Sequence, residues 1–259
     1  MTPRSLLILG GTAEASALAG ATVARFGPAL SVTTSFAGRT PSPRPVAGFK
    51  RVGGFGGPQG LLRYLCENRV ERVIDASHPF AARISSAARL ACEEAGVPRL
   101  LFLRPPWRRD RRDRWIEVAD MAAAAGFLES ASGCAFLTVG PSEIAAFAAL
   151  ERMRFVVRLV APRKEPLPLS RCEIVFGRGP FTLEGERALF TRYGIDLLVS
   201  KASGGAASEA KILAARERGM PVVMVARPPR EPGPFTQSIE AALDWLLDPE
   251  AFGDRGRLG

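Results

Sequence analysis

The chain has 259 residues, of which 47% are hydrophobic and 24% charged, as is typical of an ordinary globular protein with at least one buried core. No apolar run approaches the roughly 18 residues that cross a bilayer, and the first residues lack a signal-peptide cleavage site, so we expect a cytoplasmic protein without a membrane partner. The four cysteines are scattered without a Cys-x-x-Cys pair, and a single histidine accompanies them, which supports neither a disulfide framework nor a metal site.

The net charge of +9 comes from 31 arginines and only four lysines. Such a surface attracts polyanions of several kinds, including nucleic acids and small polycarboxylates. The densest basic run, residues 104–114, contains Trp107 and is interpreted either as an anion clamp or, by preference, as a solvated linker. No zinc-finger spacing or aromatic RNA-binding motif accompanies the charge, so we expect no nucleic-acid partner.

Strand-like segments alternate with amphipathic or alanine-rich segments in the first part of the chain. The strand-like segments are residues 6–9, 30–34, 72–75 and 100–103. The first of them is apolar at every position, as expected for a parallel strand that is covered on both faces. Residues 1–104 are therefore predicted to form a Rossmann-like domain.

Proline and arginine interrupt this pattern at residues 105–114, which we predict to be a linker. Strand-like segments then resume at residues 135–139, 155–160, 173–176, 196–200 and 222–225. We predict a second α/β domain over residues 115–259, with a last helix at 237–247 and a fraying tail at 253–259. The expected fold class is thus α/β, with two Rossmann-like domains, mainly parallel sheets and a ligand cleft between the domains.

A glycine-rich turn follows the first predicted strand. Gly10 and Gly11 are followed by Thr12 and Glu14, which lie in the first turn of the next predicted helix. Glycine lets a ligand approach the backbone closely, and the N-H groups at a helix N-terminus bind phosphate. The turn lacks the Gly-x-Gly-x-x-Gly fingerprint, so a tight structural turn remains the alternative.

The end of the second predicted strand favours NADP over NAD. A Rossmann site for NAD usually has an acidic residue there, whereas this chain has Thr34 and Ser35 followed by Arg39. No acidic residue occurs between Glu14 and Glu67. Hydroxyls and a guanidinium suit a 2′-phosphate, although an acid-poor stretch in an arginine-rich protein would look the same.

The only histidine, His78, follows the predicted strand at 72–75 and precedes Pro79 at an expected first helical position. Ligands bind at the carboxyl edge of an open parallel sheet, so His78 and Ser77 are predicted to lie in a site. The alternative is a histidine that only makes structural hydrogen bonds.

Two segments of the second half carry further candidates. The first, Gly177-Arg178-Gly179-Pro180-Phe181, lets the backbone approach a flat or charged group, or is an ordinary Gly-Pro turn. The second contains Lys201 and Lys211, two of the four lysines. A lysine at a strand end can neutralise a carboxylate or donate a proton, and its pKa falls when it is desolvated. The polar turn between these lysines, at 203–205, offers further donors, or is a helix cap with solvated charges.

Four motifs in this order resemble the precorrin-6A reductase family of cobalamin biosynthesis, the CobK and CbiJ proteins. They are Leu-Gly-Gly-Thr-Ala-Glu-Ala at 9–15, Asp-Ala-Ser-His-Pro-Phe-Ala at 75–81, Gly-Arg-Gly-Pro-Phe at 177–181, and Ser-Lys-Ala-Ser-Gly-Gly at 200–205 with Glu209-Ala210-Lys211. The similarity covers nearly the whole chain except the arginine-rich run and the tail. It implies NADPH-dependent reduction of precorrin-6A to precorrin-6B, or of the cobalt-containing counterpart, without a metal or flavin in the protein.

The resemblance and the residue patterns together predict three groups of site residues. The candidate proton donors are His78 and Lys201. The cofactor contacts are Gly10, Gly11, Thr12, Glu14, Thr34, Ser35, Arg39 and Ser77. The substrate contacts are Gly177, Arg178, Gly179, Phe181, Ser200, Ser203, Gly204, Gly205, Lys211 and Arg227.

The implied partner is a tetrapyrrole-derived polycarboxylate, which a basic protein would capture by paired hydrogen bonds. The oligomeric state stays open, and a monomer is compatible with the sequence. Two alternatives remain: another NADP-dependent reductase or nucleotide-sugar enzyme on a similar scaffold, and a non-catalytic anion or nucleic-acid binder that uses the 104–114 run.

Overall fold

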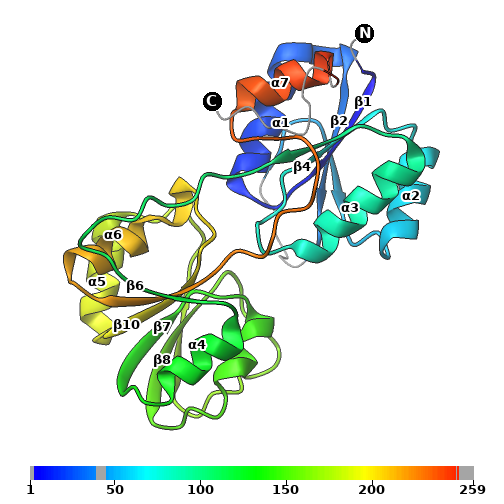
Figure 1. Cartoon of the computed structure of the whole chain (residues 1–259). Coiled ribbons are helices and arrows are strands. Elements are labelled where there is room, and N and C mark those ends of the chain that lie inside the picture. The colour runs from blue at the N-terminus through cyan, green and yellow to red at the C-terminus, as the bar shows by residue number, and fades with distance from the viewer. Residues whose placement is uncertain (1–2, 39–44, 249, 251–259) are drawn as a thin grey trace. The chain divides into compact units, whose positions relative to one another are not determined.

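The computed structural model describes residues 3–38, 45–248 and 250, which form two compact units. The first unit contains the described residues up to Pro105 together with those from Pro228 onward, and the second is Pro106–Arg227. Each unit is built around a six-stranded sheet with helices on both faces (Figure 1). The predicted α/β fold class with two parallel sheets is confirmed.

The first sheet has the strand order β12-β5-β4-β1-β2-β3, and every neighbouring pair is parallel. This is the doubly wound Rossmann order, in which the chain reverses direction across the sheet between β1 and β4. Its strands are β1 (Ser5–Leu9), β2 (Ser31–Phe36), β3 (Phe49–Val52), β4 (Arg72–Asp75), β5 (Arg99–Phe102) and β12 (Phe235–Thr236).

Helices bury both faces of this sheet. On one face α1 (Ala13–Phe26), extended by a 3₁₀ turn η1 (Gly27–Ala29), packs beside α7 (Ile239–Leu247), and on the other α2 (Pro58–Glu67) packs beside α3 (Ala82–Ala95) (Figure 1). Successive side chains of a strand point to opposite faces, so alternate residues of β1 enter separate hydrophobic cores on the two faces. Such a strand must be apolar throughout, which explains its unbroken apolar sequence.

The C-terminal part of the chain corrects the predicted domain boundary. The sequence pattern predicts that residues 115–259 form the second domain, but β12 pairs with β5 and α7 packs against α1 in the first unit. The predicted helix at 237–247 does form, over Ile239–Leu247. The prediction was wrong because a local pattern identifies a helix but not the sheet that the helix covers.

The second sheet is also entirely parallel, with the order β6-β11-β10-β7-β8-β9. Here the strand order reverses between β7 and β10. The strands are β6 (Arg114–Val118), β7 (Gly133–Leu137), β8 (Met153–Leu159), β9 (Cys172–Phe176), β10 (Leu197–Lys201) and β11 (Pro221–Val225). The helical segments are α4 (Met121–Leu128), η2 (Pro141–Phe147), α5 (Leu183–Tyr193), η3 (Ala206–Ser208) and α6 (Ala210–Glu217).

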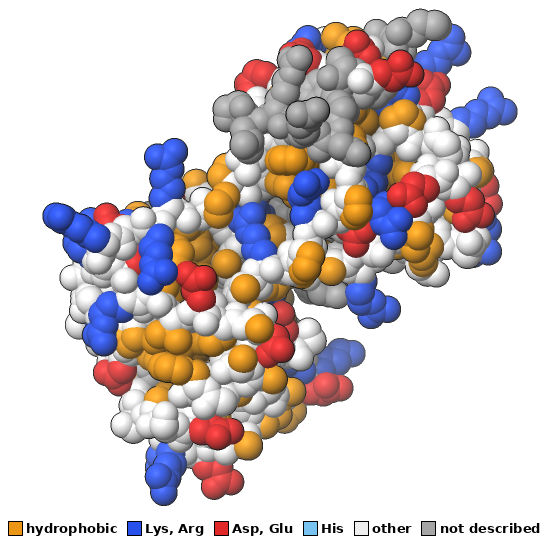
Figure 2. Space-filling view, in the orientation of Figure 1, with side chains coloured by type: hydrophobic (Ala, Val, Ile, Leu, Met, Phe, Trp, Pro, Cys, Tyr) orange, Lys and Arg blue, Asp and Glu red, His pale blue; other side chains and the backbone are white. Residues whose placement is uncertain are grey.

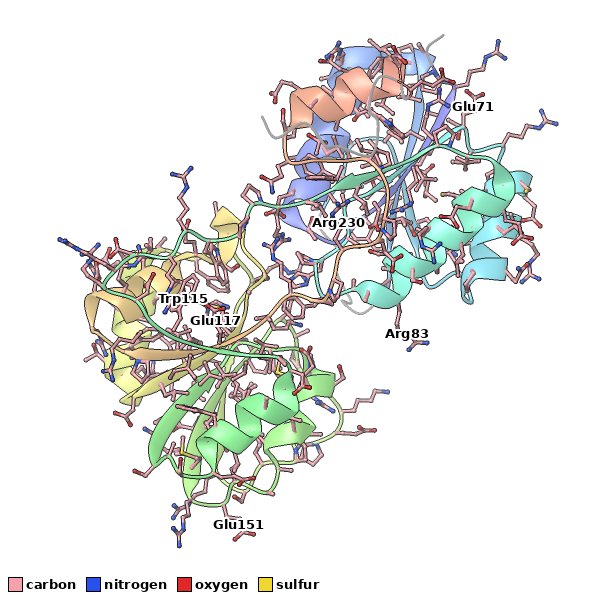
Figure 3. All side chains as sticks on the ribbon, in the orientation of Figure 1. Glu71, Arg83, Trp115, Glu117, Glu151 and Arg230 are labelled. Carbon is pink, nitrogen blue, oxygen red and sulfur yellow. The ribbon has the colours of Figure 1, made fainter. Side chains whose placement is uncertain are left out.

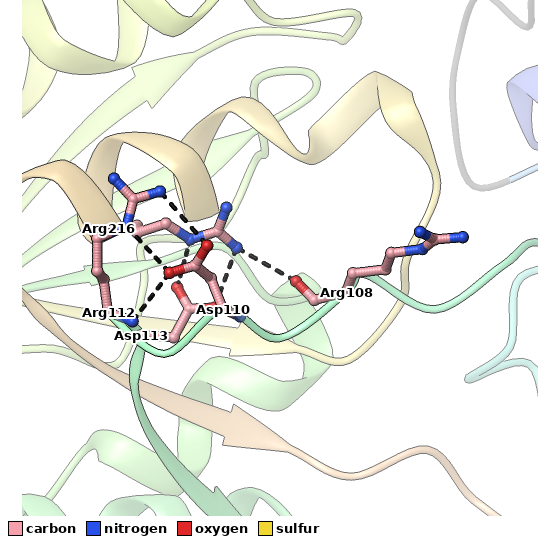
Figure 4. Close-up of polar contacts among 5 residues, drawn as sticks. All are labelled: Arg108, Asp110, Arg112, Asp113 and Arg216. Carbon is pink, nitrogen blue, oxygen red and sulfur yellow. Dashed lines mark hydrogen bonds and ion pairs between the residues drawn. The ribbon is translucent and has the colours of Figure 1, made fainter.

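The arginine-rich run is part of the second unit, which corrects its prediction as a solvated linker at 105–114. Trp107 is buried in the hydrophobic core of this unit. The Asp113 carboxylate is almost fully buried and accepts two hydrogen bonds from the Arg216 guanidinium, at 2.8 and 3.0 Å (Figure 4). Beside this pair, the Arg112 hydrogen bonds hold the pKa of Asp110 down at about 2.

The run then continues into the edge strand β6. Trp115 and Glu117 are two residues apart on this strand, so their side chains leave the same face (Figure 3). Arg109 forms an ion pair with Glu117 at 3.1 Å and lies 5.9 Å from the Trp115 ring centroid. Two arginines of the run, Arg109 and Arg112, are thus paired with carboxylates of the same unit.

On the face shown in Figure 2, Lys and Arg side chains are dispersed among acidic and apolar ones, without a continuous basic stripe. None of the helices in the described part of the chain combines the length and the apolar character required to span a bilayer.

Candidate active site

The turn between β1 and α1 lies at the carboxyl edge of the first sheet. Thr12 caps α1, since its Oγ1 accepts the Ala15 N-H at 3.0 Å. The same hydroxyl donates to the Ala76 carbonyl at 3.2 Å, which connects this turn with the segment after β4. Because β1 and β4 flank the point where the strand order reverses, the turn occupies the usual ligand position of an open α/β sheet.

Glycine is needed at the two positions of this turn for different structural reasons. A Cβ on Gly10 would lie 2.9 Å from Thr34 Cγ2, so the turn can approach β2 only without a side chain there. Gly11 has a φ of +114°, and a Cβ at this position would meet nothing within 4 Å. The backbone beside the N-terminus of α1 is therefore open, as an anion cradle requires.

The end of β2 differs in part from the prediction. Thr34 is fully buried beneath Gly10, and its Oγ1 has no hydrogen-bond partner among the residues that the structure describes. The Ser35 hydroxyl accepts a hydrogen bond from Arg51 Nη1 at 3.3 Å. Arg39 lies outside the described residues. Arg51, which the sequence did not single out, thus places a guanidinium at this strand end.

The segment after β4 holds Ser77 and His78 in a compact turn. The buried carboxylate of Asp75 accepts the Ser77 N-H at 3.1 Å, and the Ser77 hydroxyl lies 3.1 Å from that of Ser85. The half-buried His78 accepts the Phe80 N-H on Nδ1 at 3.2 Å. An accepting Nδ1 carries no proton, so the neutral ring holds its proton on Nε2.

The helix after His78 begins later than predicted. Pro79 was expected in the first turn, but α3 starts at Ala82. The Ala81 N-H donates to the His78 carbonyl at 2.7 Å, so residues 78–81 close a separate turn. This turn uses the backbone groups that would otherwise have continued the helix.

Glu14 is predicted to contact the cofactor, and its carboxylate pairs with Arg104 at 2.8 Å in a largely buried setting. Burial lowers the pKa of Arg104, and the Glu14 charge acts in the opposite direction. This pair fixes the segment after β5 against the first turn of α1, so within the first unit Glu14 has a structural partner.

In the second unit, Lys201 ends β10 beside the point where the strand order reverses. Its Nζ lies 2.9 Å from Glu143 Oε2 and 3.1 Å from Glu143 Oε1. The Gly140 N-H donates to the same Oε2 at 2.6 Å, which holds the carboxylate at the end of β7. Glu143 is not among the site residues predicted from the sequence. Its signal was a proline two residues ahead, in Gly140-Pro141-Ser142-Glu143 after a predicted strand, which is typical of a helix start.

Lys211 is buried near the same strand ends. Its Nζ donates to Thr138 Oγ1 at 2.7 Å and lies 5.5 Å from the centroid of the Trp107 ring. Burial above all, together with the neighbouring charge of Arg158, lowers the pKa of Lys211 to about 7, while Glu186 opposes the shift. A lysine of this pKa exchanges its proton near neutral pH.

The structure brings together the two predicted substrate segments, Gly177–Phe181 and the segment from Lys201 to Lys211. The Phe181 N-H donates to the Ala207 carbonyl at 3.1 Å, and a Cβ on Gly179 would lie 2.6 Å from that oxygen. The Phe181 ring stacks 4.0 Å from the Arg158 guanidinium, which itself forms a buried two-bond ion pair with Glu186 at 2.7 and 2.9 Å. Gly177–Phe181 is thus supported from within the unit, and Arg178 is exposed.

The loop after β10 is braced by its neighbours. Arg227 donates to the carbonyls of Ala202 and Ser203, at 2.6 and 3.0 Å, and Trp107 Nε1 donates to the Gly205 carbonyl at 3.0 Å. Gly204 and Gly205 both have positive φ values, 63° and 80°, which explains the glycine pair. Ser200 is fully buried within β10, and Ser203 is buried beside the loop backbone.

The described residues contain no group of three or more His, Cys, Asp or Glu side chains that could hold a metal ion.

Comparison with known proteins gives a consistent result. The family model described as precorrin-6x reductase CbiJ/CobK matches residues 5–247. Precorrin-6A reductase of Rhodobacter capsulatus is 42% identical over 243 residues, covering 94% of this chain and 96% of the relative. Cobalt-precorrin-6A reductase of Salmonella typhimurium is 29% identical, covering 88% and 89%. A solved structure described as CobK precorrin-6A reductase matches with a TM-score of 0.90 and 41% identity, over 98% of this chain and 100% of that one.

Proposed function

Because the chain belongs to the precorrin-6x reductase CbiJ/CobK family, we propose that it reduces precorrin-6A with NADPH as the hydride donor. Membership makes the chain an oxidoreductase of cobalamin biosynthesis that acts on a tetrapyrrole precursor. The choice of NADPH, the residues that contact it and the source of the proton are our proposals.

The observation that carries the cofactor proposal is the open backbone at Gly11 beside the capped N-terminus of α1. The first turn of a helix presents backbone N-H groups, which suit a pyrophosphate. The acid-poor region from residue 15 to 66 suits the additional 2′-phosphate of NADPH, since no carboxylate there would repel it. When bound, NADPH supplies the hydride, and Gly10, Gly11, Thr12 and Ser35 would position it.

Reduction of a conjugated double bond adds a hydride to one atom and a proton to its partner. We propose Lys201 Nζ and His78 Nε2 as the two candidate proton sources, each at the carboxyl edge of its own sheet. Glu143 holds the Lys201 ammonium in place, and the bond from Phe80 to Nδ1 keeps the His78 proton on Nε2. Ser77, Glu14 and Thr34 would act by shaping the turns around them.

The substrate carries several carboxylates, for which Arg178 and Lys201 are the proposed contacts. The backbone path of the turn that holds Arg178 would be set by Gly177, Gly179 and Phe181. The path of the loop after Lys201 would be set by Ser203, Gly204, Gly205 and Arg227. The buried side chains of Ser200 and Lys211 would support these segments from inside the unit.

We propose precorrin-6A rather than its cobalt counterpart as the physiological substrate. Identity is 42% and 39% to two precorrin-6A reductases, but 30% and 27% to two cobalt-precorrin-6A reductases. All four cysteines are free thiols, which suits a reducing compartment, and we place the activity in the cytoplasm.

The direct test is to incubate the purified chain with precorrin-6A and either NADPH or NADH, and to follow oxidation of the nicotinamide and the mass of the product. We expect a product two hydrogens heavier and a higher kcat/KM with NADPH. A folded sample that turns over neither precorrin-6A nor its cobalt form would overturn the assignment. Reduction of the cobalt form alone would overturn only the choice of substrate.

A further inference from the structure

We infer that Arg51 binds the 2′-phosphate of NADPH and thereby selects NADPH over NADH. The inference rests on the proposed use of a nicotinamide dinucleotide and assigns its specificity to one residue. Arg51 was not among the cofactor contacts predicted from the sequence.

Arg51 lies at the carboxyl end of β2 because β3 pairs with that strand. It lies on β3 in register with Ser35, the fifth residue of β2, and its Nη1 donates to the Ser35 hydroxyl at 3.3 Å. The residues at the carboxyl end of the second strand of a Rossmann sheet contact the adenosine ribose, where a carboxylate selects NAD and a nearby arginine accommodates the 2′-phosphate of NADP. Arg51 occupies that place through sheet pairing, although it is 16 residues away from Ser35.

The guanidinium is also held in one orientation. It lies 3.8 Å from the Phe55 ring centroid and 5.2 Å from that of Tyr64, and it donates to the carbonyls of Gly53 and Gly54 at 2.5 and 2.9 Å. These bonds and the one to Ser35 use three of the five N-H groups of an arginine, through Nη1 and Nη2. Nε-H and one Nη2-H remain, which together can hold two oxygens of a phosphate.

The charge of Arg51 favours an anionic ligand. Among the residues that the structure describes, no carboxylate forms an ion pair with Arg51, and its protein acceptors are a hydroxyl and two neutral carbonyls. A half-buried guanidinium that is stacked on aromatic rings and lacks a counter-charge gains most from an anionic ligand. A ribose 2′-hydroxyl offers no such charge, so Arg51 should favour binding of NADPH over NADH.

The test compares Arg51→Gln, Arg51→Lys and a matched control, Lys50→Gln. Lys50 is exposed and precedes Arg51 on the same strand, so its side chain points to the other face. Kd is measured for NADPH and NADH, and for the fragments 2′,5′-ADP and 5′-AMP, which differ only in the 2′-phosphate.

We expect Arg51→Gln to weaken binding of NADPH and 2′,5′-ADP roughly 10- to 100-fold, and to change binding of NADH and 5′-AMP less than about twofold. Arg51→Lys should fall between wild type and Arg51→Gln, because it keeps the charge but loses the two-pronged geometry. Lys50→Gln should leave the ratio of the two Kd values unchanged.

Equal losses for NADPH and NADH in both Arg51 variants, or the same change of ratio in Lys50→Gln, would overturn the inference. If Arg51→Gln does not fold, the ratio in Arg51→Lys decides alone. Wild-type protein that turns over precorrin-6A with NADPH and NADH equally well would refute the role of Arg51 but not the reductase activity. Wild-type protein that binds neither dinucleotide would refute the proposed cofactor itself.

Discussion

Lys201 Nζ lies 2.9 Å from Glu143 Oε2, and this ion pair joins the end of β10 to the segment after β7. The two strands flank the reversal of strand order in the second unit, where open α/β sheets bind ligands. Both side chains are largely buried, at 15% and 27% exposure, so solvent screens their attraction only in part. The pair therefore supplies a positioned ammonium at the expected ligand edge.

Glu143→Gln should lower both stability and activity. Glutamine can still accept the Gly140 N-H but cannot neutralise Lys201, so we expect a loss of about 1–3 kcal/mol in unfolding free energy. Turnover of precorrin-6A should fall roughly tenfold if the ammonium loses its position. The control is Glu151→Gln, an exposed carboxylate outside the pair. Denaturant unfolding and steady-state kinetics measure the two effects, and Glu143→Gln behaving like the control would contradict this role.

Lys211 should make the stability depend on pH above neutrality. Its pKa is lowered to about 7 in the folded chain, against about 10.4 in an unfolded one. Between these values the unfolded chain binds a proton that the folded chain does not, so stability should rise with pH, by up to about 1.4 kcal/mol per pH unit. Below about pH 7 both states bind the proton, and this contribution becomes constant.

Urea unfolding from pH 6 to about pH 9.5 tests the prediction by comparing wild type with Lys211→Met and with Lys164→Met, an exposed lysine. Only Lys211→Met should reduce the slope. Identical slopes in all three proteins would show that Lys211 stays protonated in the folded chain.

Gly10→Ala and Gly20→Ala should have opposite effects. A Cβ on Gly10 would lie 2.9 Å from Thr34 Cγ2 and 3.3 Å from Ala15 Cβ, and neither short side chain can move away, so we expect about 1–3 kcal/mol of destabilisation and weaker NADPH binding. Gly20 is inside α1 with open space around it, so alanine should add up to about 1 kcal/mol. Thermal unfolding gives the sign of each effect, and a Gly10→Ala variant as stable as wild type would contradict the predicted clash.

His78 is tested with two variants that separate its imidazole from its local hydrogen bond. Asparagine at position 78 can accept the Phe80 N-H in an Asx turn, whereas alanine cannot. We expect kcat for precorrin-6A to fall at least tenfold in both His78→Asn and His78→Ala, with the melting temperature of His78→Asn close to that of wild type. Wild-type kcat in His78→Asn would assign His78 a structural role only.

The type of most helices and strands could be predicted from the amino-acid sequence alone. Residues 6–9 of β1 are buried on both faces of the sheet, and this burial requires the unbroken apolar run from which the strand was predicted. The exposed edge strand β3, with the sequence Phe-Lys-Arg-Val, and the two-residue β12 escaped prediction because neither has such a run. Four short motifs were sufficient to identify the family, which the comparisons confirmed.

Contacts between residues far apart in the sequence could not be predicted in this way. Glu143 pairs with Lys201 across 58 positions, and Thr12 donates to Ala76 across 64. Sheet pairing also placed Arg51 beside Ser35 and returned β12 to the first sheet. A local pattern records how deeply a segment is buried and with what period, but strand order and register set its neighbours, and these depend on the whole chain.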